Sequence, residues 1–443
     1  MPTIDELKTS VQAEVDRHGD DLIGVAKAVL DNPETGFREE KTSRLVGEKF
    51  AEMGIPYQGR IAITGLKGVL DGGSSGPTVA VMGELDSLKV LGHPHADPDT
   101  DAAHACGHHC QIGMMLGAAV GLMAPGVLEN LAGRVALIAV PAEEYIEIEY
   151  RDDLRREGKL EFLGGKPEFI RTGALDDVDI AMMTHTSSRN SDEGKIAFGG
   201  TNNGLIAKRI QFTGRAAHAG GAPHMGVNAL NAAMIALSAI HAQRETYRDQ
   251  DTIRIHPIIT RGGVSVNSVP ADVRMETFVR GRTVEAFQSA GEKVDRALRA
   301  GAMAVGGSVT ITTLAGYLPL RSDDKMLDLY SANAARLVGE DSLTRLEHRT
   351  GSTDMGDLSH IMPVIHPYVV AATGSGHGDD YIVEDYELGV LTGAKAMAMT
   401  VIDLLADGAT RAQEIKAAYN APMTKAQYLS VMRGMLREKT YTE

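Results

Sequence analysis

Two short apolar runs constrain the fold of this chain more than any other feature. Residues 78–82 (TVAVM) and 134–140 (RVALIAV) are almost continuously apolar and rich in β-branched residues, which is typical of strands buried on both faces of a sheet. Between them, residues 111–123 are small and apolar and predict a buried helix. Two helices are expected earlier, at 5–30 and 41–53. Strands that alternate with helices in this way predict an α/β fold.

The pattern changes near residue 205. A half-exposed strand at 205–213 is followed by a helix (228–245), two strands, a second helix (283–304) and a last strand (308–313). This β-α-β-β-α-β order is typical of a ferredoxin-like α+β domain, which closes on itself. We therefore expect a small domain inserted into a larger α/β domain, with boundaries at 1–200, 201–318 and 319–443, the last part ending in a polar helical tail.

Composition excludes several classes of partner. A chain of 443 residues is too long for one ordinary core, and its net charge of −15 argues against nucleic acid or an anionic membrane as a partner. We find no apolar run near 18 residues, so we expect no membrane-spanning helix. The N-terminal segment is charged and amphipathic, unlike a signal peptide, and the two cysteines cannot form a disulfide framework. These features predict a reducing, cytoplasmic location.

The chain places three histidines and both cysteines in seven residues, 104–110 (HACGHHC). Cysteine thiolate and imidazole are good ligands for zinc-like divalent metals. Cys106 and His108 flank Gly107, which lets the backbone turn so that both side chains can face one point. A solvated histidine cluster beside a buried cysteine would fit the seven residues equally well, and a Cys nucleophile with a His base also stays open on these residues alone. The Cys-x-x-x-Cys spacing argues against a redox pair, which requires Cys-x-x-Cys.

Other polar residues follow expected strands or stand in turns. Glu143 and Glu144 come directly after the strand 134–140, where open α/β sheets place active sites, and two such carboxylates can divide metal ligation and proton transfer between them. His185 ends a strand-like run, His377 stands in a glycine-rich loop, and Asp86 follows the strand 78–82. Asp86 could hold a ligating imidazole in the right tautomer. Each signal alone is weak, but the whole set suits two metal ions.

The order and spacing of these motifs resemble the aminoacylase/carboxypeptidase-type dinuclear metallohydrolases. Within them, the chain is most similar to the amidohydrolase branch of hippurate hydrolase, indole-acetyl-amino-acid hydrolases and p-aminobenzoyl-glutamate hydrolase subunits. The likeness covers residues 5–405 or so, and the motifs that carry it are GELDSL, HACGHH, VPAEE, MMTHT, FTGRAAHAGGAPHMGVNALNA, GGVSVNSVPADVRMETFVRG, GSTDMGDLSH and GSGHGDD.

The resemblance implies a role for each residue. Cys106 would bridge two divalent ions, with manganese or zinc favoured and cobalt or nickel possible. Glu143 would be the general base, taking a proton from a water bridged between the metals and passing it to the leaving nitrogen of an amide bond. The remaining ligands would be His108, Glu144, His185 and His377.

The resemblance also gives the inserted domain a function as a lid and dimerisation platform over a metal-binding catalytic domain. His218 would reach across the interface of a homodimer to stabilise the partner site's developing oxyanion. Asn267 would help bind a small-molecule substrate. Arg280 is a candidate for binding an anionic group of that substrate, although a surface salt bridge would explain it equally well.

Two departures from the family pattern leave alternatives open. Many relatives have Asp or Asn where this chain has His109, which could contact substrate, ligate a metal or do neither. The charged stretch 145–163 is longer than the simplest members need, and either shapes the substrate pocket or forms a surface helix. The leading expectation is hydrolysis of a C–N bond in a small N-acyl or aryl-acyl amino acid or dipeptide. The alternatives are release of ammonia from an aromatic amine, and a non-catalytic binding subunit.

Overall fold

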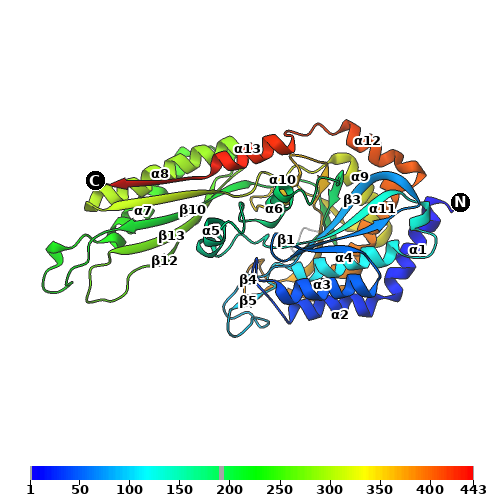
Figure 1. Cartoon of the computed structure of the whole chain (residues 1–443), viewed down its shortest axis with the longest axis horizontal. Coiled ribbons are helices and arrows are strands. Elements are labelled where there is room, and N and C mark those ends of the chain that lie inside the picture. Colours follow the sequence, from blue (N-terminus) through cyan, green and yellow to red (C-terminus); the bar gives the residue numbers. More distant parts are fainter. Residues whose placement is uncertain (1, 189–193, 443) are drawn as a thin grey trace.

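The computed structural model describes residues 2–188 and 194–442. Figure 1 shows an elongated molecule, with a helix-covered sheet at the end that carries the N-terminus and a second sheet at the end that carries the C-terminus. The two ends correspond to the larger α/β domain and the inserted α+β domain. The predicted fold class is therefore confirmed.

The larger domain is built on a six-stranded sheet in the order β1-β2-β6-β3-β7-β16. The two apolar runs are its central strands β3 (Ser74–Glu84) and β6 (Ala132–Val140), which pair in parallel. β7 and β16 extend the parallel part, while β1 and β2 form an antiparallel edge. Their bounds are β1 (Tyr57–Ile61), β2 (Gly65–Asp71), β7 (Ile180–Met182) and β16 (Val364–Ile365).

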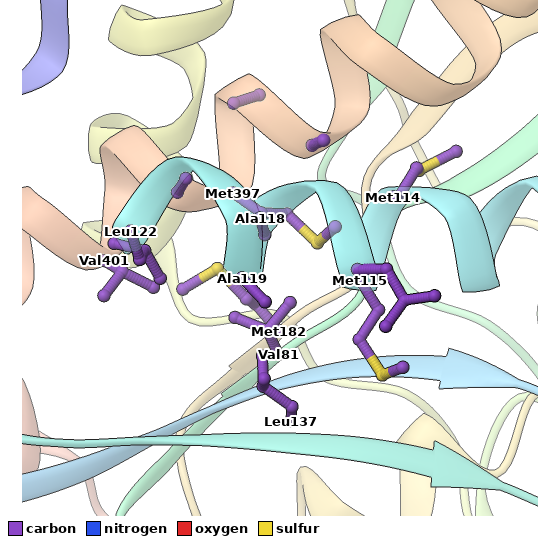
Figure 2. Packing of buried hydrophobic residues seen from close by; sticks show 14 of the residues in the cluster. Val81, Met114, Met115, Ala118, Ala119, Leu122, Leu137, Met182, Met397 and Val401 are labelled. Carbon is purple, nitrogen blue, oxygen red and sulfur yellow. The ribbon is translucent and has the colours of Figure 1, made fainter. Parts of the chain in front are cut away.

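Helix α4 (His108–Leu122) crosses this sheet and is almost wholly buried, because small and apolar residues occupy all of its faces. Figure 2 shows it packed between the sheet and α11 (Gly393–Leu405). Its sheet side meets Val81, Leu137 and Met182, and its other side meets Met397 and Val401. The other helices of this domain are α1 (Ile4–Arg17), α2 (Gly19–Leu30), α3 (Glu40–Glu52), α5 (Ile148–Arg156), α6 (Gly165–Thr172), α9 (Asp324–Val338) and α10 (Met355–Leu358).

One helical span, Glu387–Leu405, is long and apolar enough to cross a membrane by length and composition. We expected no apolar run near 18 residues, and Lys395 and Asp403 interrupt this one. In the structure 83% of its most apolar window is buried inside the molecule. Packing against α4 and the core accounts for its composition.

A second, five-stranded sheet borders the central one in the larger domain. Its parallel pair β8 (His185–Ser188) and β17 (Tyr368–Thr373) presents His185, and the loop after β17 carries His377. The sheet is completed by β9 (Ile196–Phe198), β15 (Leu343–Arg345) and β18 (Ile382–Val383), and a small hairpin is formed by β4 (Leu88–Lys89) and β5 (Ala102–Ala103).

The inserted domain has the predicted order of strands and helices, with one expected strand divided in two. Its elements are β10 (Gly204–Thr213), α7 (Ala229–Ala242), β11 (Arg254–Ile255), β12 (Ile258–Arg261), β13 (Asp272–Gly281), α8 (Val284–Val305) and β14 (Ser308–Ala315). Strand β13 alternates buried and half-buried residues, as a sheet with one covered face requires.

The end of the chain differs from the expected helical tail. Helices α12 (Thr410–Ala418) and α13 (Lys425–Met435) are present, but a strand, β19 (Arg437–Thr442), follows them. β19 pairs antiparallel with β14 and so joins the sheet of the inserted domain. In Figure 1 the chain can be followed from α12 on the larger domain through α13 to the C-terminus, which lies on the inserted domain.

Candidate metal centre

The HACGHHC segment forms a tight turn that ends where α4 begins. Gly107 has a φ of 88°, in the left-handed region that favours glycine. A Cβ atom there would lie 1.7 Å from the Oγ1 atom of Thr186. The turn therefore requires glycine at this position for two reasons, the left-handed backbone and the lack of space for a Cβ atom. It brings Cys106 and His108 close together.

Cys106 is shared by two groups of potential metal ligands. The first group is Cys106, His108 and His185, and the second is Cys106, Glu144 and His377. Within each group, one ligand atom per residue lies within 4.8 Å of the others. The Sγ atom of Cys106 is 3.4 Å from Nε2 of His185, and Nε2 of His377 is 3.3 Å from Oε1 of Glu144. Cys106 is therefore common to two adjacent groups that could each hold a metal ion.

The chemistry of these atoms fits divalent metals. Thiolate, imidazole and carboxylate are their usual protein ligands. Oε1 of Glu144 and Nε2 of His108 are buried and make no well-aligned hydrogen bond within the described part of the chain, although each has a charged neighbour, at 3.3 and 3.1 Å. Burial and Glu144 would raise the pKa of the Cys106 thiol, but His185, His108 and His377 lower it to about 6. A thiolate is therefore accessible near neutral pH.

The two neighbouring glutamates have pKa values driven apart. Burial raises the pKa of Glu143 well above its usual value, and the charges of Glu84 and Glu144 add to this. Burial also opposes ionisation of Glu144, but His377 outweighs it and lowers that pKa to about 2. One carboxylate is thus kept charged, while the other retains affinity for a proton, as a division between ligand and proton carrier requires.

Asp86 organises both sides of the centre. Its Oδ2 atom accepts a hydrogen bond from the backbone N–H of Glu144 at 2.8 Å. Its backbone carbonyl lies 2.9 Å from Nδ1 of His108, and its Oδ1 atom lies 3.4 Å from the same nitrogen. These contacts hold Nδ1 of His108 and leave Nε2 turned toward the centre.

A buried ion network that the sequence analysis missed lies beneath the centre. Lys166 is fully buried, and its Nζ atom contacts Oε1 of Glu84 at 2.5 Å and also the carboxylate of Asp354. The other oxygen of Glu84 accepts a hydrogen bond from Gln111 at 2.9 Å and lies 3.1 Å from Nε2 of His108. The buried ammonium group of Lys166 thus neutralises Glu84 and Asp354, and Glu84 lies beside the candidate ligand His108.

A cavity of about 310 Å³ opens onto both ligand groups. Cys106 and both glutamates line it from the larger domain, and Arg280 lines it from the inserted domain. Arg349, which the sequence analysis did not identify, lines it as well, with its guanidinium group 4.8 Å from the ring centre of Tyr368. Four of the candidate ligands (Cys106, Glu144, His185 and His377) and two guanidinium groups therefore share one cavity.

Comparison with known proteins identifies the family. Residues 201–304 match the model of the M20 peptidase dimerisation domain. The chain is 30% identical over 347 residues to the mouse Xaa-Arg dipeptidase, covering 74% of this chain and 70% of that protein. The chain belongs to the M20 metallohydrolase family. The indole-3-acetyl-aspartic acid hydrolase of Enterobacter agglomerans is also similar, with 27% identity and coverage of 78% of each chain.

Solved structures agree with the M20 fold. A dinuclear metal-binding M20-family peptidase of Bacillus subtilis matches with a TM-score of 0.62 and 22% identity, covering 88% of this chain and 99% of the other. The aminobenzoyl-glutamate utilization protein of Klebsiella pneumoniae matches with a TM-score of 0.66 and 19% identity, covering 88% and 97%. The expected family and enzyme class, a metal-dependent amidohydrolase, are confirmed.

Two predicted site residues of the inserted domain do not line the cavity. His218 and Asn267 are both exposed on the inserted domain, on segments that pair with each other. The backbone N–H of Ala219 donates to the carbonyl of Asn267 at 2.9 Å. Nδ1 of His218 accepts from the backbone N–H groups of Gly220 and Gly221 at 3.2 and 3.0 Å. The fold thus brings the two residues together, within the domain that matches the dimerisation model.

His109, for which the sequence left the role open, faces a different cavity. It is buried and lines a space of about 250 Å³ together with His93, His95 and His104. Its ring centre is 5.4 Å from that of His104. Burial lowers the pKa of His109 to about 3, and the charges of neighbouring histidines contribute. His109 does not line the cavity that holds Cys106, so the structure gives no support to a substrate contact there.

Proposed function

We propose that this enzyme hydrolyses the amide bond of a small N-acyl amino acid or dipeptide that carries a free carboxylate, and that it uses two divalent metal ions. The observation that carries the proposal is the pair of ligand groups that share Cys106 at a cavity also lined by Glu143. Manganese and zinc are the favoured metals, and cobalt and nickel also suit these ligands.

In this proposal Cys106 would be a ligand of both ions. His108 and His185 would hold one ion, and Glu144 and His377 would hold the other. When bound, such ions polarise a carbonyl oxygen and lower the pKa of water. Glu143 accepts the proton of the attacking water and delivers it to the leaving nitrogen. Its raised pKa supports the second of these steps, because a carboxyl group with affinity for a proton can act as the acid.

We further propose that the active enzyme is a homodimer in which His218 and Asn267 act on the partner's site. The support is their exposed position, outside the cavity of their own chain, on the domain that matches the M20 dimerisation model. His218 would donate to the oxygen that becomes negative in the transition state. Because Cys106 and Cys110 are both free, we propose a reducing, cytoplasmic location.

The substrate's carboxylate is assigned to Arg280. Its guanidinium group lines the cavity, and Nη1 lies 3.4 Å from Oγ of Ser352. Arg349 adds a second guanidinium group to the same wall. The names of similar proteins, a dipeptidase and an acyl-aspartate hydrolase, support a substrate of this class.

The test is a substrate panel with the Mn²⁺-loaded and the Zn²⁺-loaded protein. It compares a dipeptide, hippurate and N-acetylmethionine with their C-terminal carboxamides, and adds a nitroaryl amine assayed for ammonia release. We expect hydrolysis of a carboxylate-bearing member, and a loss of about 100-fold or more in kcat/KM for its carboxamide. Ammonia release from the nitroaryl amine alone would replace this function with the aromatic aminohydrolase alternative.

Two variants test the residue roles. Glu143→Gln should lower kcat by about 100-fold or more while both metals stay bound; full turnover would overturn the mechanism. Cys106→Ser should reduce bound metal, measured by elemental analysis. Mixing Glu143→Gln and His218→Ala proteins under conditions of subunit exchange should restore activity, because one site of each mixed dimer is then intact. No restoration would place His218 in its own chain's site or outside catalysis.

A further inference from the structure

The charged stretch 145–163 forms a connection between the catalytic loop and the inserted domain. Its helix α5 lies between the strands β10 and β13 and the body of the larger domain (Figure 1). One side of α5 binds the loop that carries Glu143 and Glu144, and the other side binds the sheet of the inserted domain. The two sets of contacts are made by neighbouring residues of one short helix.

On the loop side the contact is made by Arg151, whose side chain is fully buried. Its guanidinium group donates to the carbonyl oxygens of Ala142 at 3.2 Å, Glu144 at 2.5 Å and Leu163 at 2.9 Å. Arg151 therefore holds the backbone on both sides of Glu143.

The loop that Arg151 holds is in an unfavourable conformation. Ala142 has a φ of 56°, in the left-handed region that a residue with a Cβ rarely adopts. Such backbone persists only where surrounding contacts enforce it. Space is reserved for the guanidinium group, because a Cβ on Gly36 would lie 2.2 Å from its Nη2 atom.

On the other side, two arginines of the inserted domain bind α5. Arg209 of β10 contacts Asp152 at 2.9 Å and Glu149 at 3.1 Å, and Arg274 of β13 also contacts Glu149. The backbone N–H of Glu149 donates to Glu276 of β13 at 3.1 Å. Asp152 is fully buried and adjoins Arg151 in sequence, so a movement of these strands is passed to the residue that holds the loop.

We propose that α5 couples the position of the inserted domain to the geometry of the catalytic loop, with Arg151 as the positioning residue. The proposal rests on the proposed function only in that Glu143 and Glu144 act on substrate and metal. Seating of β10 and β13 on α5 fixes Arg151, which fixes the carbonyls on either side of Glu143. Tyr317, which follows β14, donates to the carbonyl of Glu143 itself and links the same loop to the other connection between the domains.

The first experiment measures the loop without using activity. Peptide-resolved hydrogen exchange of the full-length Mn²⁺-loaded protein follows the backbone amides of Ala142, Glu144 and Ile146, each of which has an acceptor in the structure. In the double variant Arg209→Met/Arg274→Met we expect these amides to exchange about tenfold faster. The variant loses the contact of Arg209 with Asp152, but Asp152 keeps Arg155 and Arg156 as partners, so its buried charge stays paired.

The matched control is Arg171→Met. Arg171 is also half-buried and also pairs with a fully buried carboxylate, Glu168, but it does not contact the inserted domain in the structure. In the Arg171→Met variant, the backbone amides of residues 142–146 should exchange hydrogen at the same rate as in the unmodified protein. Equal exchange in the double variant and in this control would overturn the coupling, whether or not the proposed function holds.

The second experiment is kinetic and uses the panel substrate that is hydrolysed fastest. Arg151→Met should lower kcat by about 100-fold with KM changed by less than about threefold, because the loop is displaced and not the substrate pocket. Arg151→Lys, which can still reach one carbonyl, should recover part of kcat. Equal losses in both variants, or a loss confined to KM, would refute positioning by Arg151. Failure of the proposed function would appear separately, as full turnover by Glu143→Gln.

Discussion

The network beneath the metal centre yields a prediction that can be worked out quantitatively. Lys166 is the buried cation between Glu84 and Asp354, which are themselves fully buried. Replacing it by methionine keeps the apolar stem and removes the charge. Breaking a buried pair by removing one partner leaves an uncompensated charge, which costs about 3–5 kcal/mol. We expect Lys166→Met to destabilise the fold by this amount at about pH 8.

The cost should depend on pH in a defined direction. Burial raises the pKa of Asp354 to about 6 even though Lys166 opposes this. Without Lys166 that pKa rises further, so the folded variant retains a proton that the unfolded chain has released. When folding raises the pKa of a carboxyl group, the free energy of unfolding falls as the pH rises from the unfolded-state pKa to the folded-state pKa. The slope is about 1.4 kcal/mol per pH unit. Above about pH 6 the variant therefore loses stability with rising pH more steeply than the unmodified protein, by up to about 1.4 kcal/mol per pH unit, until the pH passes the raised pKa of Asp354.

Urea unfolding followed by circular dichroism measures this difference, since the chain has no tryptophan for fluorescence. Lys67→Met is the matched control: Lys67 binds Asp177, which is exposed, so its loss should cost less than about 1 kcal/mol at either pH. A Lys166→Met defect no larger than that of the control, or one of equal size at both pH values, would refute the reasoning.

Three further outcomes are expected. Gly107→Ala should reduce bound metal in elemental analysis, because its Cβ would lie 1.7 Å from Oγ1 of Thr186; normal metal content would show that the turn can adapt. Tyr428→Phe should cost about 1–3 kcal/mol in urea unfolding, since its hydroxyl donates to Oδ1 of the buried Asp357 at 2.9 Å; an unchanged midpoint would assign that bond no role in stability. A chain that stops before β19 should show faster hydrogen exchange along β14, its pairing partner; unchanged exchange would mean that the pairing adds nothing.

The sequence predicted the parts of the fold that depend on long patterns. The strands β3 and β6 and helix α4 were recognisable because a segment buried on all sides is apolar along its whole length. The residues of the two ligand groups were recognisable because they follow strands or stand in turns, and the structure brings them within ligand distance of Cys106. Their roles as ligands remain predictions that the metal analysis tests.

Single buried charges could not be predicted in this way. Lys166 and Arg151 each look like surface residues in the sequence, since lysine and arginine are almost never fully buried unless paired. Their partners are distant along the chain or are backbone carbonyls, which leave no trace in the sequence. Strand β19 was missed for a related reason: its residues are polar and mostly exposed, and only pairing with the edge strand β14 makes it a strand.

Helix geometry alone could have predicted that the two adjacent histidines of HACGHHC, His108 and His109, face different surroundings. His108 is the first residue of α4 and His109 is the second, and successive side chains of a helix point about 100° apart. If His108 faces Cys106 and Asp86, His109 has to project elsewhere, and its ring lies 6.0 Å from that of Tyr386, at the second cavity. If the proposed function holds, the residues that distinguish one substrate from another are those that line the first cavity, above all Arg280 and Arg349, and not His109, which lines the second.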